Sequence, residues 1–356
     1  MQPIAVFFIL FYFFLGKMGK GYLKITQVDF ALFAYFLFSC FFLFKNFSGV
    51  ESTYIAIREV FLIYILIFIF NLVEISYKQW EYILKFIFLL TILNIIFVFL
   101  IFFIGWEEYT KLLVGETFWG IHPEYKFKFS DFFRKSYFEL YRVPALIGES
   151  AAVGHFGLIS FFLLKDHKKF KILAYLSLIL VVFCFTRSVY VVIILYFFLL
   201  GLTTNKRFAR LVLYSLPCFP ILAFALFKFN LLDITSLLMR FDFWSELMNV
   251  KFNPVYGGAI GTVGLASEAD GFETVIDNYW IFLLFSIGII GLVLCLLFFY
   301  EKTKNKSDLV IITISFFISG LFITLTQSLV FVSLFPLLFM NYKYLEKQNG
   351  KINPIE

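Results

Sequence analysis

Charged side chains placed against apolar segments are the residues of this chain best suited to chemistry. Arg142 stands at the entry to an apolar run, Glu149 lies about one and a half turns inside that run, and His155 lies deeper in the same run. Arg187 stands between two other apolar runs with almost no loop around it. A guanidinium binds phosphate groups through two hydrogen bonds at once, and a carboxylate can accept the proton of a hydroxyl. These residue types indicate a site that binds anions and transfers protons.

The second half of the chain carries two more such groups. Arg240 precedes Trp244 in a long polar segment, and Asp277, Asn278 and Tyr279 stand immediately before another apolar run. Charged groups beside or within membrane segments are costly, so they indicate function by default. We therefore expect the elements around both groups to place these side chains at one face of the membrane.

Each group also has a structural alternative. Glu149 could form a buried pair with His155 or Arg142 on a packing face that the small residues from Gly148 to Gly157 make possible. Arg187 could extend its side chain to the membrane surface. Arg240 could be a solvated loop charge. A cluster of three carboxylates could be an ordinary acidic loop or could bind a divalent cation through oxygen; it comprises Glu268, Asp270 and Glu273.

The composition sets the class of protein that must position these residues. Of 356 residues 62% are hydrophobic and only 15% are charged, and the mean hydropathy is +0.91. Soluble domains are about 45–50% apolar, so a soluble protein is excluded. At about 20 residues per crossing, the apolar runs allow about eleven spans. They are continuous rather than alternating, which excludes a membrane β-barrel. We expect an all-α polytopic integral membrane protein.

The apolar runs and the basic breaks between them predict the topology. The runs lie at about 3–15, 28–44, 53–73, 83–105, 145–164, 172–186, 188–202, 211–228, 275–299, 309–326 and 328–341. The first run is short, so ten to twelve crossings are consistent with the sequence. Lys and Arg concentrate in the short breaks on one side, which is therefore cytoplasmic, with the N-terminus outside. This distribution explains the net charge of +6 without nucleic acid.

The sequence predicts that the whole chain, 1–356, forms one polytopic domain with a cytoplasmic tail at 342–356. Two long loops, 106–143 and 229–274, face the other side and are too aromatic to be disordered. We expect them to pack over the membrane as an external cap. The four cysteines lie inside apolar runs without paired spacing, so they predict neither a disulfide framework nor a metal site.

Taken in order, these motifs resemble the O-antigen polymerase (Wzy) and O-antigen ligase superfamily of bacterial envelope glycan enzymes. The resemblance covers roughly residues 140–295. It rests on the Arg142–Glu149 stretch, Thr186-Arg187-Ser188, Arg240 with Trp244, Asn253-Pro254 with Gly257-Gly258, and Asp277-Asn278 leading to Gly288 and Gly291. Ser150 stands where the family usually has Pro, and Thr186 where it usually has Ser. Asp277 replaces the His typical of ligases, which favours a polymerase.

The resemblance implies a GT-C-like fold in the bacterial inner (plasma) membrane, with about 11 transmembrane helices, two large extracytoplasmic loops and a periplasmic or extracellular active face. The donor glycan would be carried on undecaprenyl diphosphate, and a hydroxyl of a second lipid-linked repeat unit would attack it. Further partners would be the lipid bilayer, a chain-length regulator and a flippase. The product would be an O-antigen, capsule or exopolysaccharide.

The same resemblance implies roles for individual residues. Arg187 and Arg240, with Arg142 as a third candidate, would bind the leaving diphosphate. Asp277, or Glu149 in second place, would act on the acceptor hydroxyl. Since arginines supply the positive charge, no cofactor and no metal is required, although the acidic cluster at 268–273 keeps a metal-dependent variant open. The remaining predicted substrate-binding residues are His155, Trp244, Asn278 and Tyr279.

Other functions stay open at this stage. A ligase-type transferase would differ only in its acceptor, and another lipid-linked glycosyl- or acyltransferase would use similar residues. A lipid-linked oligosaccharide flippase or transporter would also need buried arginines and carboxylates. Many transporters show two similar halves with helices broken at matching positions, and this hydropathy pattern has no such symmetry.

Overall fold

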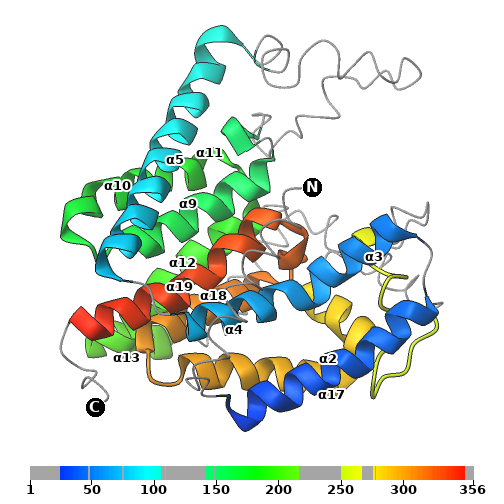
Figure 1. Ribbon diagram of the computed structural model, residues 1–356. Helices are drawn as coiled ribbons and strands as arrows, with labels where there is room; N and C mark the ends of the chain where they lie inside the picture. Colours follow the sequence, from blue (N-terminus) through cyan, green and yellow to red (C-terminus); the bar gives the residue numbers. More distant parts are fainter. Residues whose placement is uncertain are drawn as a thin grey trace. The chain divides into compact units, whose positions relative to one another are not determined.

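The computed structural model describes residues 25–46, 49–73, 76–105, 109, 142–147, 149–215, 250–266, 276 and 278–348. These residues form helices joined by turns and contain no β-strand (Figure 1). The predicted all-helical class is therefore confirmed for this part of the chain. Within it, five helical stretches are long and apolar enough to cross a membrane, namely Gln27–Lys45, Val50–Leu72, Tyr77–Ile104, Arg187–Thr204 and Tyr279–Thr303.

Most helix bounds agree with the apolar runs. The helices are α2 (Gln27–Lys45), α3 (Val50–Ile57), α4 (Ile63–Leu72), α5 (Tyr77–Ile104), α9 (Ser150–Leu164), α10 (Lys171–Leu176), α11 (Leu178–Phe183), α12 (Arg187–Thr204), α13 (Lys206–Ser215), α17 (Tyr279–Thr303), α18 (Ser307–Ser319) and α19 (Leu329–Gln348). A π-helical turn, Arg58–Leu62, joins α3 to α4. Short 3₁₀ turns lie at Ala145–Ile147, Lys168–Phe170 and Leu325–Gln327. The first apolar run and most of the run at 211–228 lie outside the described residues.

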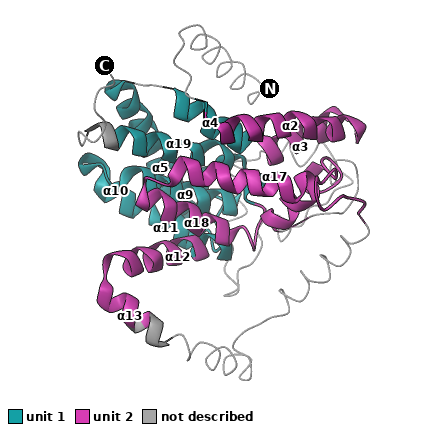
Figure 2. Ribbon diagram, turned by 90° about the horizontal axis from the view of Figure 1, so that it is seen from below, with its two compact units in different colours: residues 1–25, 62–190, 325–356 teal, residues 26–61, 191–324 magenta. Residues whose placement is uncertain are grey.

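The chain divides into two compact units, coloured separately in Figure 2. Unit 1 comprises residues 1–25, 62–190 and 325–356, and unit 2 comprises residues 26–61 and 191–324. Each unit is built from segments far apart in the sequence, so its helices associate by packing rather than by following one another along the chain.

In unit 1, α9 is the central helix. Its side chains are buried continuously from Ala152 to Leu164. Two glycines allow neighbouring segments to approach it closely. A Cβ on Gly154 would lie 2.7 Å from the sulfur of Cys184, and a Cβ on Gly157 would lie 2.9 Å from the Ser177 carbonyl oxygen. The small residues of this stretch are therefore packing positions, as their spacing predicts.

The predicted span at 172–186 is divided into α10 and α11 at Ser177. The Ser177 hydroxyl donates hydrogen bonds to the carbonyl oxygens of Ala174 (2.7 Å) and Gly157 (3.1 Å). A serine that bonds to a carbonyl one turn earlier bends a helix. Here the second bond fixes the bend against α9, so the division is part of the packing of unit 1.

Helix ends within unit 1 meet at a polar network. Asn341 of α19 accepts a hydrogen bond from the indole of Trp80, at the start of α5, and its amide donates to the Leu163 carbonyl, at the end of α9. His167, just after α9, bonds to the same Asn341 side chain at 2.9 Å. The start of α5 therefore lies beside the ends of α9 and α19. The predicted topology requires this arrangement, because it places the start of α5 on the same side of the membrane as the ends of α9 and α19.

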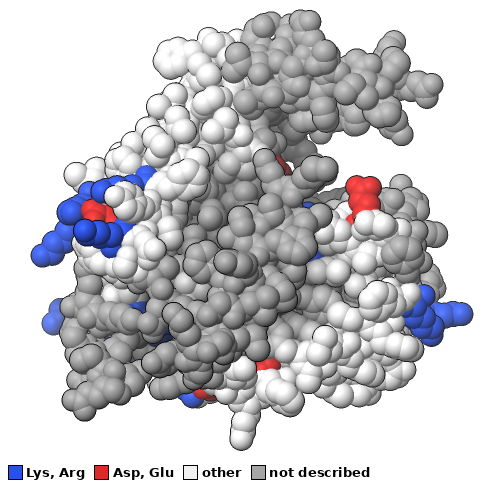
Figure 3. Space-filling view, in the orientation of Figure 1, with Lys and Arg blue, Asp and Glu red and all other residues white. Residues whose placement is uncertain are grey.

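In unit 2, α2 and α17 pack against each other in antiparallel orientation. Lys302, near the end of α17, forms a 2.7 Å ion pair with Asp29, in the first turn of α2. Asp29 is fully buried, so the ammonium group compensates a charge that would otherwise be costly in apolar surroundings. The outward side of α2 is apolar and exposed, as a surface facing lipid would be; it includes Phe30, Leu37, Phe41 and Phe44. On the face drawn in Figure 3, charged side chains gather in a few places and most of the described surface is uncharged.

Replacing Gly157 by alanine tests the packing of unit 1. The added methyl group would collide with the Leu180 side chain and with the Ser177 carbonyl oxygen, both at 2.9 Å. We expect Gly157→Ala to destabilise the protein by about 1–3 kcal/mol through overpacking. The measurement is the unfolding temperature of purified protein in detergent. Gly49→Ala is the matched control, because its nearest neighbouring atom would be 3.8 Å away. Equal unfolding temperatures for the two variants would contradict this account of α9.

Candidate functional site

Unit 1 brings together two of the segments singled out from the sequence. We call residues 142–149 and 183–187 the arginine cluster. The backbone N–H of Val143 donates a 3.2 Å hydrogen bond to the Phe183 carbonyl oxygen, so the two segments run beside each other. Arg142 is half-buried next to this bond, and Arg187 is exposed at the first residue of α12.

The backbone of the arginine cluster is strained at two places. Ala145 has a φ of 42° and Phe185 a φ of 47°, in the left-handed region that residues with a Cβ rarely adopt. Such strain persists only where the surroundings impose it, and it is found preferentially at functional sites. Each strained residue lies within one turn of an arginine. The backbone conformation near Arg142 and Arg187 is therefore maintained at a cost in stability.

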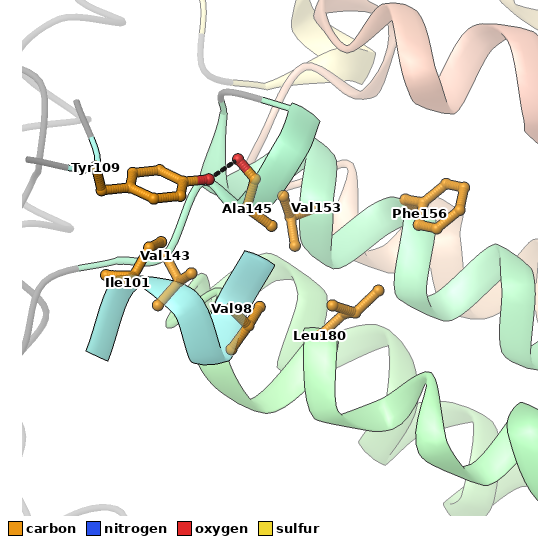
Figure 4. Packing of buried hydrophobic residues seen from close by; sticks show 8 residues of the cluster. All are labelled: Val98, Ile101, Tyr109, Val143, Ala145, Val153, Phe156 and Leu180. Atoms are coloured by element: carbon orange, nitrogen blue, oxygen red, sulfur yellow. Dashed lines mark hydrogen bonds between the residues drawn. The ribbon is translucent and has the colours of Figure 1, made fainter. Parts of the chain in front are cut away.

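Packing of the arginine cluster against buried hydrophobic residues holds its backbone in this strained conformation. The Tyr109 hydroxyl donates a hydrogen bond to the Ala145 carbonyl oxygen (Figure 4). Val143 and Ala145 have no exposed surface, and both belong to a hydrophobic cluster that also contains Val98, Ile101, Tyr109, Val153, Phe156 and Leu180. The arginines are thus attached to a rigid base rather than to a loose loop.

The turn that carries Arg187 is braced by side-chain hydrogen bonds. The Thr186 hydroxyl donates to the Cys184 carbonyl oxygen at 3.1 Å, and the Tyr190 hydroxyl donates to the Val182 carbonyl oxygen at 2.5 Å. Val189, one turn beyond Thr186, packs against the site of Gly154 in α9. Arg187 therefore begins α12 at a fixed position. The N-terminus of that helix adds its own partial positive charge to the guanidinium, which suits an anion.

The position expected for Glu149 is wrong. The sequence placed it about one and a half turns inside a span, but α9 begins at Ser150 and Glu149 is its exposed N-cap residue. The cause is the preceding segment: Pro144 and the strained Ala145 interrupt helical geometry, and a 3₁₀ turn follows. Glu149 thereby belongs to the arginine cluster at the start of the helix.

His155 lies on α9, beyond the arginine cluster, and is fully buried. Its ring is 5.4 Å from the ring of Phe331 in α19. In this structure His155 is a packing residue between two helices, and its role in substrate binding stays a prediction.

Unit 2 contains a candidate membrane-spanning helix that is broken in its interior. Gly288 of α17 has φ 65° and ψ −175°, far from helical values. At 1.5 Å per residue it lies about 14 Å along the helix from Tyr279. Non-helical backbone at such a depth requires hydrogen-bond partners within the protein, because lipid provides none. A Cβ on Gly288 would collide with the Gly257 nitrogen, so the backbone of another segment approaches α17 closely at the break.

Residues 250–266, which we call the inserted loop, supply partners for the broken helix. The N–H groups of Gly258 and Ala259 donate to the carbonyl oxygens of Ser286 and Phe285, each at 3.1 Å. In the other direction, Ile289 and Ile290 donate to the carbonyl oxygens of Pro254 (2.9 Å) and Val255 (3.1 Å). A Cβ on Gly257 would lie 2.5 Å from the Gly288 nitrogen, so glycine is required where the backbones meet. The Pro-x-x-Gly-Gly motif therefore fits the break in α17.

Helix α2 completes this arrangement with two side chains. The Tyr35 hydroxyl donates hydrogen bonds to the carbonyl oxygens of Ile287 (2.7 Å) and Tyr256 (3.2 Å). The Asn46 amide donates to the carbonyl oxygens of Gly258 (2.9 Å) and Ile260 (3.0 Å). Tyr35 thus provides a donor to a carbonyl group at the break in α17, and Asn46 provides donors to two carbonyl groups of the inserted loop.

The described part of the second long loop lies at the break in α17, and its expected place over the membrane as a cap stays a prediction. The inserted loop packs against the interior of α17 and against α2, with Ala259, Ile260 and Val263 buried. The backbone hydrogen bonds that the broken helix makes available are the physical reason for this position.

Asn278 and Tyr279 have structural roles at the start of α17. The Asn278 side-chain oxygen accepts from the N–H groups of Trp280 and Ile281, both at 3.0 Å, and its amide donates to the Leu321 carbonyl oxygen at 3.1 Å. Asn278 is thus the N-cap of α17, and Tyr279 beside it is buried. Their contact with a substrate stays a prediction.

Three predicted site residues lie outside the described residues, namely Arg240, Trp244 and Asp277. The acidic cluster at 268–273 lies there too. Among the described residues no group of three His, Cys, Asp or Glu side chains could hold a metal ion.

Sequence reasoning passed over Arg58 and Glu59. Both lie in the π-helical turn within the candidate span Val50–Leu72, and the Glu59 side chain has no exposed surface. Two adjacent charges within the apolar run at 53–73 were the available signal. A π-helical turn inside an α-helix is itself frequent at functional sites.

Compared with models of known protein families, with curated proteins and with solved structures, the chain matches none of them. Its function is therefore inferred from its own residues and their geometry.

Replacing Tyr35 by phenylalanine tests the break in α17. The change removes the hydroxyl that serves the Ile287 and Tyr256 carbonyl oxygens and leaves them without that donor. We expect a loss of about 1–3 kcal/mol, seen as a lower unfolding temperature in detergent. Tyr300→Phe, on the exposed side of the same helix α17, is the control and should change little. A Tyr35→Phe protein as stable as this control would show that the hydroxyl contributes nothing to the break.

Proposed function

We propose that this protein is a polysaccharide polymerase of the bacterial plasma membrane. It would transfer a glycan from undecaprenyl diphosphate to a lipid-linked repeat unit on the outer face of the membrane. The order of its motifs, similar to that of the O-antigen polymerase and ligase superfamily, suggests this reaction. The composition and five long apolar helices support a membrane location.

The arginine cluster is the observation that carries the proposal. The segments that carry Arg142 and Arg187 are joined by the backbone hydrogen bond from Val143 to Phe183, and each segment has a strained residue within one turn of its arginine. Positive charge fixed in this way, at the ends of apolar helices, fits a ligand with a diphosphate group and a lipid tail. A preorganised guanidinium needs no rearrangement as the negative charge develops on the leaving group.

The proposed step is a substitution at the anomeric carbon of the donor. The oxygen of the acceptor hydroxyl forms a bond to that carbon, and the bond from the carbon to the diphosphate oxygen breaks. The electron pair leaves with the lipid diphosphate, whose charge Arg142, Arg187 and Arg240 would neutralise. The hydroxyl proton passes to a carboxylate, for which Asp277 is the first candidate and Glu149 the second. Neither a metal nor a cofactor is needed for this balance.

A flippase is the second candidate, and the broken helix α17 is the observation that favours it. Many transporters bind their cargo at helices interrupted near the middle of the membrane. In this chain, however, the inserted loop and Tyr35 already occupy the carbonyl oxygens of Phe285, Ser286 and Ile287. Backbone groups engaged in this way are less available to a substrate, which favours the transferase.

Purified protein in liposomes, supplied only with lipid-diphosphate-linked repeat units, distinguishes these candidates. A polymerase would produce a ladder of longer lipid-linked glycans together with free lipid diphosphate, without nucleotide sugar or ATP. Unchanged substrate that appears in the opposite leaflet would favour the flippase. Substrate that stays unchanged by itself, and is consumed once a lipid A core acceptor is added, would favour the ligase-type reaction.

Substitutions of Arg187 test the diphosphate-binding role. Arg187→Ala should lower the rate of glycan transfer by about 10²- to 10³-fold, the usual effect of losing one donor to a developing charge. Arg187→Lys should restore little of this rate, because an ammonium group cannot form the two parallel hydrogen bonds of a guanidinium.

Arg207→Ala is the matched control, since Arg207 is exposed at the start of α13 and plays no part in the proposed site. The readout is the rate in the liposome assay at equal amounts of inserted protein. Wild-type rates from Arg187→Ala would remove Arg187 from the proposed site.

A further inference from the structure

Glu59 and the inserted loop meet inside unit 2. Glu59 has no exposed surface and lies about 14 Å along the helix from Val50, at 1.5 Å per residue. A Cβ on Gly264 would lie 2.8 Å from the carboxylate oxygen Oε2 of Glu59 and 2.8 Å from the ring of Phe282. The carboxylate therefore lies directly against the backbone of the inserted loop.

Glu59 and Gly264 both lie where the backbone departs from regular secondary structure. Glu59 lies in the π-helical turn Arg58–Leu62, whose extra residue rotates the side chains relative to a regular α-helix. Gly264 has a φ of +77°, which a residue with a side chain rarely adopts. Each chain segment departs from regular structure at the point where the other approaches it.

The inserted loop is thus held at two separate places. Residues 254–259 pair with the backbone of the break in α17, and Gly264 rests on Glu59. Burial of a carboxylate is costly, and simple packing at this position could use an apolar side chain instead. Retention of a charged group in the interior indicates that its polar chemistry is used.

We propose that Glu59 is a positioning residue that holds the C-terminal half of the inserted loop in its place. In the sequence, this loop lies between Arg240 and Asp277. The consequence for catalysis rests on the proposed function. The structural consequence, which is the position of the loop, does not.

The experiment measures the position of the loop without reference to activity. Ala266 is fully buried two residues beyond Gly264, and Ala259 is buried at the other end of the loop. Each is replaced by cysteine in a background lacking the native cysteines. The rate of labelling by a membrane-impermeant maleimide is then compared between Glu59 variants.

We expect Glu59→Gln to increase the labelling rate at Ala266→Cys by about tenfold or more, because a neutral amide would replace the carboxylate that lies against the loop. Glu59→Asp, which keeps the charge, should label more slowly than Glu59→Gln. Labelling at Ala259→Cys should change less, since backbone hydrogen bonds hold that end. Glu51→Gln is the matched control and should have no effect, because Glu51 is an exposed carboxylate on α3, the helix that precedes the π-helical turn.

Labelling of Ala266→Cys that stays at the wild-type rate in Glu59→Gln would overturn the proposal. So would a Glu59→Asp variant that labels as fast as Glu59→Gln, because the charge would then be irrelevant. Unfolding of the variants would raise labelling at both reporters equally, and that result would also count against a local role.

The same variants, assayed for glycan transfer, separate this inference from the proposed function. If both are correct, Glu59→Gln lowers kcat more than it raises KM for the lipid-linked donor, because reacting groups are misplaced while the diphosphate is still bound. If labelling responds but no glycan transfer is observed with any variant or with the wild type, the positioning role stands and the polymerase proposal fails.

Discussion

The structure depends on one constraint, which is that backbone N–H and C=O groups in apolar surroundings must find partners within the protein. Most of the described chain meets it with helices. Where α17 is interrupted at Gly288, the inserted loop and Tyr35 of α2 provide the partners instead. Unit 2 is therefore a set of elements that cannot be separated without exposing polar backbone. In the same unit, the buried Asp29–Lys302 ion pair links the antiparallel helices α2 and α17.

Unit 1 meets a different demand. Its arginine cluster holds charged side chains at helix ends on a backbone that is strained at Ala145 and Phe185. The strain is supported by the hydrophobic cluster below and by the Tyr109 hydrogen bond. A rigid arrangement of this kind gains nothing for stability, so its value lies in keeping Arg142 and Arg187 in place. A transferase that must stabilise a departing diphosphate would use such rigidity.

Sequence and structure agreed best on residues whose role follows from local chemistry. Gly154 and Gly157 allow close packing, as small residues do. The cap that Asn278 forms on α17 is a finding of the structure, since the sequence analysis assigned Asn278 only to substrate binding. Sequence and structure disagreed on Glu149, because Pro144 and the strained backbone delay the start of α9. The pairing of the inserted loop with α17 was not expected from the sequence, because backbone hydrogen bonds hold this loop and side-chain patterns do not reveal them.

The sequence by itself determined that the chain is an all-helical protein with helices able to cross a membrane, and it located most helix bounds. These properties follow from hydrophobic content and run length, which are additive along the chain. Only the tertiary structure decided which distant segments meet: Val143 with Phe183, Gly257 with Gly288, and Glu59 with Gly264. Such contacts depend on the fit of two backbones, and fit is a property of pairs of segments that neither segment carries alone.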